Sequence, residues 1–305
     1  MPVPESFRAL ASKVNNWGRW GDDDELGTLN LITDDVRRRG AACVKTGKAF
    51  ALAIPLSEDG PQLGFIAGRV NPARTMHMIN EPSFGDPTMF CSSDDAVTMG
   101  LQAGTHWDSL AHVSYDGRLW NGFDPASITE AGASKGGIDK VGSLVGRGVL
   151  LDVARAKGVD RLEPGYSVTG DDLDAATRTA VEPGDIVLIR TGQMQLLHAG
   201  DKNAYTHPSP GPSIHCVEWF RAHDIAAAAT DTLVFEAFPG DNPDFLLPVH
   251  LLDIVEMGLT QGQNWDLEDL ARDCADDGVY EFFLSATPEP FVQGLGSPVA
   301  PVALK

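Results

Sequence analysis

The chain has 305 residues, a formal net charge of −20 and a pI near 4.6. Its hydrophobic share of 43% and charged share of 22% are ordinary for a soluble globular protein, and its length suits one large domain. The acidity argues against binding to nucleic acid or to an anionic membrane surface, because both require a basic face. No apolar run in the sequence reaches the length that spans a bilayer.

The cysteines and the first residues indicate a cellular compartment. Cys43, Cys91, Cys216 and Cys274 show no C-x-x-C spacing, so we interpret them as free thiols in a reducing environment. The start, Met1–Glu5, has neither a basic residue nor an apolar stretch, so no signal peptide is expected. Both features favour a cytoplasmic location.

Residues 1–47 are expected to form a loop rich in Trp and Gly, followed by a helix that packs on the domain. Thr33 is a suitable N-cap, and the aspartates after it complement the positive end of a helix that should run to the end of this segment. Phe50–Leu56 has the pattern of a buried strand. Trp17 either covers the edge of the core or lines the mouth of a pocket.

Residues 57–96 are rich in Gly, Pro, Asn and Asp and show little periodicity. Long loops in compact domains are often functional, so one interpretation is a flap that covers the substrate, with Phe84 in contact with it. The other interpretation is an extra hairpin without substrate contact. The next segment, Ala96–Gln102, is expected to be a strand that leads into the motif below.

The most informative stretch runs from Gln102 to His112 and reads Gln-Ala-Gly-Thr-His-Trp-Asp-Ser-Leu-Ala-His. His106 and Asp108 are two residues apart, so a strand would present both on one face, together with Gln102. His112 follows four residues after Asp108, which suits a turn of helix. Imidazoles and a carboxylate that converge in this way are ligands for Zn or Mn. A hydrogen-bonded pair, with Trp107 in the core, is the alternative.

Later segments alternate strands and helices, which is typical of α/β layering. The expected elements are strands at 148–153, 186–190, 224–229, 278–286 and 294–299, and helices at 171–181, 214–223 and 248–258. Ser213 is a suitable N-cap for the second of these helices. Asp231 follows a strand and either orients a ligand histidine or caps a helix. His250 lies on the last helix and, taken alone, fits a satisfied, partly buried histidine.

The segment Gly-Thr-His-x-Asp-x-x-x-His at residues 104–112 resembles the signature of the cyclase family, metal-dependent hydrolases that include bacterial kynurenine formamidase and isatin hydrolase. The family pattern is His-x-Gly-Thr-His-x-Asp-x-Pro-x-His, so Gln102 and Leu110 depart from it. Similar segments before and after the motif extend the resemblance from about residue 16 onward. It implies a single domain over 1–305, with an α/β fold in which helices flank a mixed sheet, the swivelling β/β/α type.

The resemblance also implies a set of metal ligands around two ions. Those of the first ion are Gln102, His106 and Asp108, and those of the second are Asp108, His112, His250 and Gln263. Gln263 stands where the family has glutamate, and Gln261 is the other candidate for that place. Each ion thus loses one ligand to glutamine, which is a poor replacement for imidazole or carboxylate on Zn. One ion, two weakly held ions and no ion all remain open, and we favour one divalent ion, Mn or Zn.

With one ion bound, the resemblance implies hydrolysis of a small non-peptide amide, formamide or lactone by a metal-activated water, with His112 as general base and acid. Basic residues are sparse around the motif, and Trp107, Trp17 and Phe84 offer aromatic contacts, so a neutral cyclic or aromatic substrate is expected. Two alternatives are a lyase or cyclase that uses the metal to stabilise an enolate, and a metal-free binding relative. By resemblance, a homodimer or homotetramer is expected.

Overall fold

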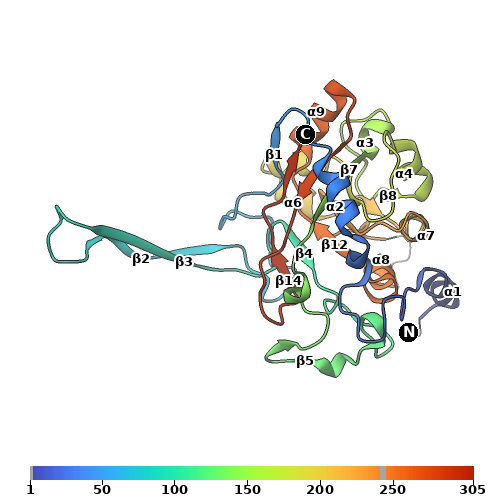
Figure 1. Cartoon of the computed structure of the whole chain (residues 1–305), viewed down its shortest axis with the longest axis horizontal. Helices are drawn as coiled ribbons and strands as arrows, with labels where there is room; N and C mark the ends of the chain where they lie inside the picture. Colours follow the sequence, from blue (N-terminus) through green and yellow to red (C-terminus); the bar gives the residue numbers. More distant parts are fainter. Residues whose placement is uncertain (1–2, 241–244) are drawn as a thin grey trace.

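The computed structural model describes residues 3–240 and 245–305 (Figure 1). Met1 and Pro2, part of the stretch considered for a signal peptide, lie outside these residues. A mixed sheet forms the centre: its middle strands run parallel, and the pairings toward both edges are antiparallel. From edge to edge, its strands are β1 (Ala49–Ala51), β15 (Val302–Leu304), β13 (Glu281–Ser285), β7 (Val145–Asp152), β9 (Ile186–Arg190), β11 (Ala227–Thr230), β12 (Thr260–Gln263), β4 (His106–Asp108) and β14 (Gly296–Pro298).

Helices and short ladders surround this sheet. The α-helices are α1 (Glu5–Val14), α2 (Asp34–Ala41), α3 (Val153–Ala156), α4 (Gly170–Ala176), α5 (Met194–His198), α6 (Lys202–Thr206), α7 (Val217–Ala222), α8 (Pro248–His250) and α9 (Glu268–Asp277). The 3-10 segments are η1 (Gly27–Leu31), η2 (Trp120–Gly122), η3 (Pro125–Ser127) and η4 (Ile138–Lys140), and η5 (Leu251–Met257) is a π-helix. The small ladders pair β2 (Ala73–Pro82) with β3 (Cys91–Thr98), β5 (Ile128–Thr129) with β6 (Gly132–Ala133), and β8 (Ser167–Val168) with β10 (Gly211–Pro212).

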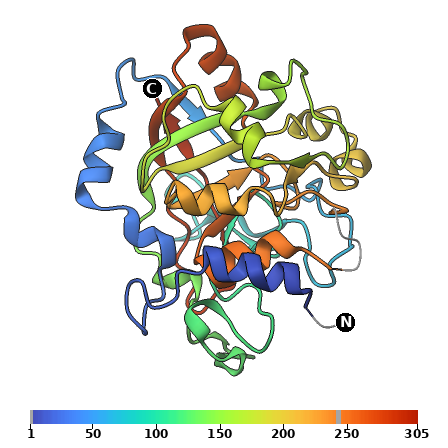
Figure 2. The same ribbon diagram turned by 90° about the vertical axis from the view of Figure 1, so that its right-hand side faces the viewer.

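The central strands are buried on both faces, and their residues alternate between two cores. Ile186 and Leu188 of β9 enter one core, which α2 and α9 cover. Val187 and Ile189 enter the other, which α1, α4, α7 and η5 cover. Figure 2 shows α1 alongside the helix formed by α8 and η5. Continuous apolar runs are typical of strands covered by helices on both sides, so the sequence predicted this α/β arrangement correctly.

Several elements begin where the sequence predicted but end earlier. α2 starts after Thr33, whose hydroxyl accepts a hydrogen bond from the Val36 amide at 3.3 Å, yet it stops at residue 41 rather than 47. Gly40 in its last turn lies directly on β7, because a Cβ there would come within 2.4 Å of the Gly146 backbone. The helix therefore ends at the point where its backbone meets the sheet. Likewise, α4 ends at residue 176 rather than 181, and β1, at 49–51, covers only residues 50 and 51 of the strand expected at 50–56.

Ser213 does not cap the helix that follows it. Its hydroxyl donates to the Val168 carbonyl at 2.7 Å, and α7 begins only at residue 217, with Cys216 as N-cap. Pro212 pairs with Val168 in the short parallel ladder of β10 and β8. The Ser213 hydroxyl therefore lies beside β8 and bonds to that strand instead of to the helix.

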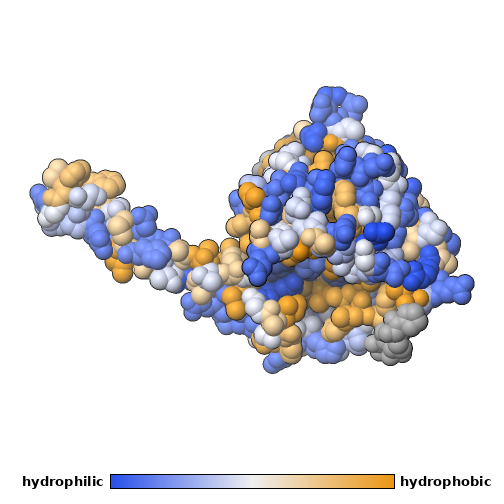
Figure 3. Space-filling model, turned by 90° about the horizontal axis from the view of Figure 1, so that it is seen from below, coloured by the Kyte–Doolittle hydropathy of each residue, from blue (hydrophilic) through white to orange (hydrophobic). Residues whose placement is uncertain are grey.

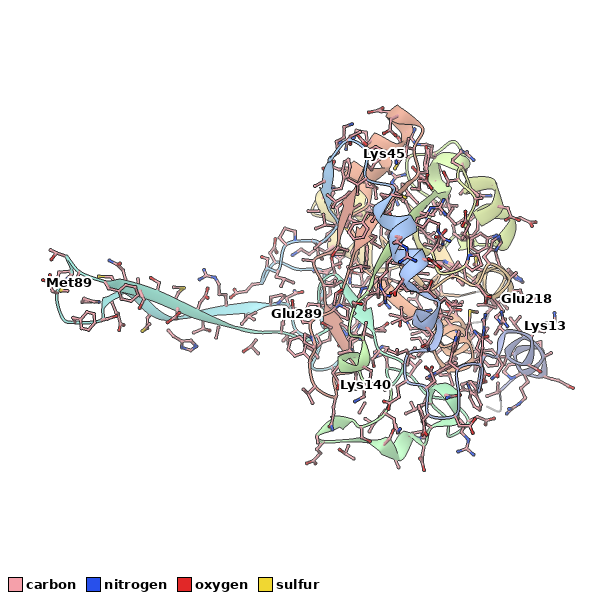
Figure 4. All side chains as sticks on the ribbon, in the orientation of Figure 1. Lys13, Lys45, Met89, Lys140, Glu218 and Glu289 are labelled. Carbon is pink, nitrogen blue, oxygen red and sulfur yellow. The ribbon has the colours of Figure 1, made fainter. Side chains whose placement is uncertain are left out.

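Residues 73–98 form a long two-stranded hairpin, here called the arm, that extends away from the body (Figure 1). The hairpin is thus present, and whether it contacts substrate stays a prediction. The expected strand at 96–102 is wrong, because β3 ends at Thr98 and belongs to the arm. Figure 4 shows Met89 at the far end of the arm. Almost every residue of β2 and β3 is exposed, so the arm lacks a core of its own.

The helix expected at 248–258 combines the short α8 with the π-helix η5. It ends at Gly258, as predicted, and this glycine has a φ of +70°. A Cβ on Gly258 would lie 2.9 Å from the Cα of Gly27 and closer still to the Trp120 ring, so no larger residue fits there. Within the described ranges, no helix has the length and apolar character needed to cross a membrane.

Candidate active site

β4 carries the central motif and lies between β12 and β14, so neighbours on both sides fix its position. His106 stands opposite Gln263 on β12, and Asp108 stands opposite Gly296 on β14. His106 and Asp108 project from the same face of this strand and are both almost completely buried. The shared face that the sequence predicted for these two residues is therefore present.

Three buried polar residues fix the entry into β4. The Thr105 hydroxyl donates to the Asn264 carbonyl at 2.5 Å, and the Asn264 amide donates to the Gly104 carbonyl at 3.0 Å. Tyr205 donates its hydroxyl to the Asn264 side-chain oxygen at 2.8 Å. Asn264 has a φ of +60°, a conformation that asparagine tolerates better than most residues. These bonds set the direction in which the motif enters the sheet.

Two imidazoles converge on one oxygen of Asp108. His106 Nε2 lies 3.6 Å and His112 Nε2 lies 3.7 Å from Asp108 Oδ1. His106 Nδ1 donates to the Gly104 carbonyl at 2.8 Å, which leaves the lone pair of Nε2 directed at the carboxylate. Both His106 Nε2 and Asp108 Oδ1 are buried and have no hydrogen-bond partner among the described residues. Such a pair of unsatisfied buried atoms requires an explanation.

His106, Asp108 and His112 are here called the trio. Their electrostatics keep Asp108 ionised and His112 neutral. Burial alone would raise the pKa of Asp108, but His112 and His106 outweigh it and hold this pKa well below its usual range. Burial lowers the pKa of His112, and the opposing effect of Asp108 does not compensate. The His112 side chain is 20% exposed, so it forms the open side of the site.

A second imidazole–carboxylate pair joins His250 of α8 to Glu236, which precedes this helix in the chain. Glu236 Oε1 accepts from the His250 ring nitrogen Nδ1 at 2.7 Å and from the His250 amide at 2.8 Å, while Oε2 accepts from the Val249 amide at 3.0 Å. Burial would lower the pKa of His250, but the bond to Glu236 raises it overall. The charge of His250 also acts on Asp108 and His112, so this pair belongs to the same site.

The Cyclase family, described as "Putative cyclase", matches residues 50–237. This chain belongs to that family. A structure described as a novel cyclase is 37% identical, with a TM-score of 0.87, and the match covers 96% of this chain and 100% of that one. More distant matches are an isatin hydrolase bound to the product analogue thioisatinate (20% identity, 87% and 94% coverage, TM-score 0.62) and a predicted metal-dependent hydrolase from Bacillus stearothermophilus (18%, 85% and 98%, 0.57). No match was found among curated proteins.

The glutamines considered as metal ligands lie in different environments. Gln263 donates its amide to Asp108 Oδ2 at 2.6 Å, so it contacts the trio directly. Gln261 donates instead to Asp253 at 2.8 Å, which places it with a different buried carboxyl. Gln102 lies on a turn rather than a strand, with its amide nitrogen over Gly296. Within the described residues, Gln102 makes no hydrogen bond to the trio.

Asp231 does not orient a histidine. It accepts hydrogen bonds from the Thr191 amide at 2.9 Å, the Thr191 hydroxyl at 2.7 Å and the Gly192 amide at 2.7 Å. Burial raises its pKa to about 6. The role expected for Asp231 belongs to Glu236, five residues later, which sequence reasoning missed because nothing in the sequence links it to His250.

The aromatic residues expected to contact the substrate occupy three different environments. Trp107 points to the face of β4 opposite the trio, where it packs edge-on against Trp265 and donates to the Ala286 carbonyl at 2.8 Å; it is a core residue. Trp17 is half-buried and donates to the Val255 carbonyl at 2.7 Å. Phe84 lies in the turn at the end of the arm and is 74% exposed, away from the site of its own chain.

Arg69, which sequence reasoning did not consider, lies close enough to the trio to affect it. Its side chain packs against Gly100, and its charge acts on both Asp108 and His112. Burial lowers the pKa of this guanidinium. Among the described residues, it has no hydrogen-bond or ion-pair partner for its side chain. Lys and Arg are sparse around the motif in the sequence. The fold nevertheless places Arg69, from a segment more than 30 residues earlier, near the trio.

The trio comes close to the geometry of a metal site without reproducing it. Within the described part of the chain, no three His, Cys, Asp or Glu side chains form a ready-made metal cluster. Ligands about 2.1 Å from a tetrahedral ion stand about 3.4 Å from one another. The separations of 3.6 and 3.7 Å are a few tenths of an ångström wider. The two unsatisfied atoms and their chemistry therefore fit a divalent ion after a small inward shift.

Proposed function

We propose that this protein is a metal-dependent hydrolase that opens a small non-peptide amide or lactone. The observation that carries the proposal is the buried pair of His106 Nε2 and Asp108 Oδ1, 3.6 Å apart, neither with a partner among the described residues. Imidazole nitrogen and carboxylate oxygen are ligands that Zn and Mn share. The fold shared with structures described as an isatin hydrolase and a predicted metal-dependent hydrolase is consistent with this chemistry.

One divalent ion, Mn or Zn, fits the donor set better than two. His106 and Asp108 would hold it, with Gln102 or His250 as a further donor, which leaves His112 for proton transfer. Gln263 donates to the other oxygen of Asp108, so that amide and that oxygen, both expected in the second ligand set, are committed to each other. When bound, such an ion polarises a carbonyl group and makes a bound water more acidic.

His112 is the residue we propose for proton transfer. Its lowered pKa keeps the imidazole neutral near pH 7, so that it can accept a proton. It is the exposed member of the trio, and Nε2 faces the same carboxylate oxygen as His106. After bond cleavage, the same nitrogen returns the proton to the leaving nitrogen or oxygen. His250, held by Glu236, contributes positive charge on the other side of the site.

The surroundings favour a substrate that gains negative charge during the reaction. A neutral lactone or cyclic amide becomes a carboxylate when its ring opens. The unpaired guanidinium of Arg69 acts on the same residues and supplies a counter-charge for such a product. We therefore still propose a neutral substrate. Arg69, rather than the ring of Trp107, is the residue we propose to contact it.

Metal content is the first test. Protein purified without a metal-affinity tag is expected to hold about one equivalent of Mn or Zn by mass spectrometry, and His106→Ala is expected to lose it. His215→Ala, which replaces a histidine of another segment, is the matched control. Absence of metal in the native protein, even after incubation with either ion, would overturn the hydrolytic proposal and favour a metal-free binding protein.

Isotope labelling tests the reaction class. The metal-loaded protein is screened against lactones, cyclic amides and formamides in oxygen-18 water. Hydrolysis places one labelled oxygen in the new carboxylate, whereas a lyase or cyclase releases products without that label. A product without the label would contradict hydrolysis and support the lyase or cyclase alternative.

A further inference from the structure

A small cavity lies on the body of the protein, between α1 and the first turn of α8. Figure 3 shows apolar residues, in orange, on the body as well as on the arm. The cavity has a volume of about 150 Å³, and the residues that line it include neither the trio nor His250. It is therefore separate from the candidate active site. Its apolar walls are formed by Phe7, Leu10, Ile214, Phe245, Pro248 and Val249.

Packing within the body holds these walls in place. Phe7 is buried, and its ring meets that of Phe245 edge-on, with the ring centroids 4.7 Å apart. Val249 is also buried, in the first turn of α8. On one side the lining residues reach the surface, because Ser6 is exposed and Gly240 is half-buried. The cavity thus has fixed apolar walls and a mouth through which a small molecule can enter.

Two polar side chains of the wall are engaged within the protein. The Ser213 hydroxyl donates to the Val168 carbonyl at 2.7 Å. The carboxylate oxygens of Glu236 both accept hydrogen bonds, from His250 and from the Val249 amide. Both side chains are thus committed to protein contacts, and a carboxylate in the wall repels an anion. These walls favour a neutral and apolar ligand.

We propose that this cavity binds a neutral molecule that carries a single ring of the size of benzene. The ring lies between α1 and α8, and any polar substituent lies at the mouth beside Ser6. An apolar cavity of about 150 Å³ excludes water and takes a benzene-sized molecule, so the ring matches the cavity in size as well as in polarity. Binding removes the ring from water and supplies the contacts that the walls lack.

A ligand in this cavity would contact the residues that hold His250. Glu236 lies in the wall, and its Oε1 accepts from His250 Nδ1 at 2.7 Å. Val249, also in the wall, donates its amide to Oε2 of Glu236 at 3.0 Å. A ring packed against both residues would restrict their movement and, through them, the movement of His250. An effect on turnover rests on the proposed function, whereas the binding site itself does not.

An NMR titration with toluene tests the site without metal or substrate. In the native protein, the methyl resonances of Ile214 and Val249 should shift saturably, with a Kd in the millimolar range. Leu10→Phe, which fills the cavity from α1, should weaken binding at least about tenfold. The matched control Leu196→Phe, at a half-buried position of α5 outside the cavity, should bind as the native protein does.

Benzoate, which adds a charge to the same ring, tests the chemical class and should not bind. Absence of saturable toluene binding, equal binding by the native protein and Leu10→Phe, or binding of benzoate as tight as that of toluene would overturn the proposal. Crystals of the native protein under xenon pressure test the cavity independently of any variant. Xenon should occupy a site between Phe7 and Val249, and an unoccupied cavity would contradict a ligand site.

The link to His250 is read in the same titration. Toluene should shift the ring resonances of His250 in the native protein, while those of His198, which lies outside the cavity, stay constant. Unchanged His250 resonances at saturation would overturn this link. None of these measurements uses metal, substrate or turnover, so failure of the hydrolase proposal would be distinguishable from failure of the binding site.

Discussion

The side-chain amide of Gln263 donates to Asp108 across 2.6 Å, at one of the two positions where the resemblance leads us to expect glutamate. A second carboxylate at this buried position would repel Asp108 unless a cation lay between them. The amide instead stabilises the Asp108 charge, and it leaves Oδ1 free for His106 and His112. Under the proposed function, this amide would let the site hold Asp108 charged with one divalent ion.

Replacement of Gln263 by glutamate should make stability dependent on metal. Without divalent ions, Gln263→Glu is expected to lower the free energy of unfolding by about 1–3 kcal/mol, because a hydrogen bond becomes a like-charge contact. Added Mn or Zn should restore the stability of this variant. Thermal unfolding with and without the ions measures the effect. Gln261 lies on the same strand but contacts Asp253 of η5 instead of Asp108, so Gln261→Glu buries a carboxyl group away from the trio and should be destabilised whether or not metal is present. Equal metal responses in both variants would disprove this role of Gln263.

Loss of the Glu236 carboxylate should reduce turnover through His250. In Glu236→Gln, the ring loses its charged acceptor, and we expect kcat to fall roughly 10- to 100-fold. The pKa of His250, followed by NMR titration, should fall as well, because the bond to Glu236 raises it in the native protein. Asp266→Asn, which alters the exposed pair of His198 and Asp266, is the control and should leave kcat unchanged. An unchanged His250 pKa would contradict the assignment.

Asp253 should make the native protein less stable as the pH rises. Burial raises its pKa to about 8, so the folded state keeps a proton that the unfolded state releases above about pH 4. Stability is then lost between about pH 4 and 8, by at most about 1.4 kcal/mol per pH unit from this group. Urea unfolding at pH 5, 7 and 9 should show a smaller decrease for Asp253→Asn than for the native protein. Parallel pH profiles would rule out this contribution.

Removal of the Thr105 hydroxyl should weaken the strand that carries the motif. Thr105→Val preserves the shape but leaves the Ile54 amide and the Asn264 carbonyl without this partner, so we expect a loss of about 2–4 kcal/mol. Thr98→Val, at an exposed position of the arm, should change stability by less than about 0.5 kcal/mol. Chemical denaturation of both variants measures the difference, and similar values for the two would show that Thr105 has no special role.

Local patterns in the sequence were sufficient to predict the central strands of the sheet and the pairing of His106 with Asp108 on one face. The apolar run Ile186–Arg190 could only be a covered strand, and the spacing of His106 and Asp108 could only place them together on one face. Both inferences depend on the two-residue period of a strand, which needs no knowledge of the rest of the chain.

Partners that meet through the fold could not be predicted in this way. Glu236 bonds to His250 across a loop, and Arg69, from the segment before the arm, acts electrostatically on the trio, although neither belongs to a recognisable motif. Asp231 also carries a carboxylate and also follows β11, yet it accepts hydrogen bonds from Thr191 and Gly192 instead. The choice between Asp231 and Glu236 depends on where α8 packs, and that is a tertiary property.

The position of β4 has a consequence for synthesis of the chain on the ribosome. β4 emerges early, but its neighbours β12 and β14 are made more than 150 residues later, and β1 likewise waits for β15 near the C-terminus. The site cannot assemble on a partly translated chain, because both sides of the motif strand are still missing. Folding of the site must therefore wait until β14 has been made, and until then the growing chain must keep the motif and the exposed arm out of other contacts.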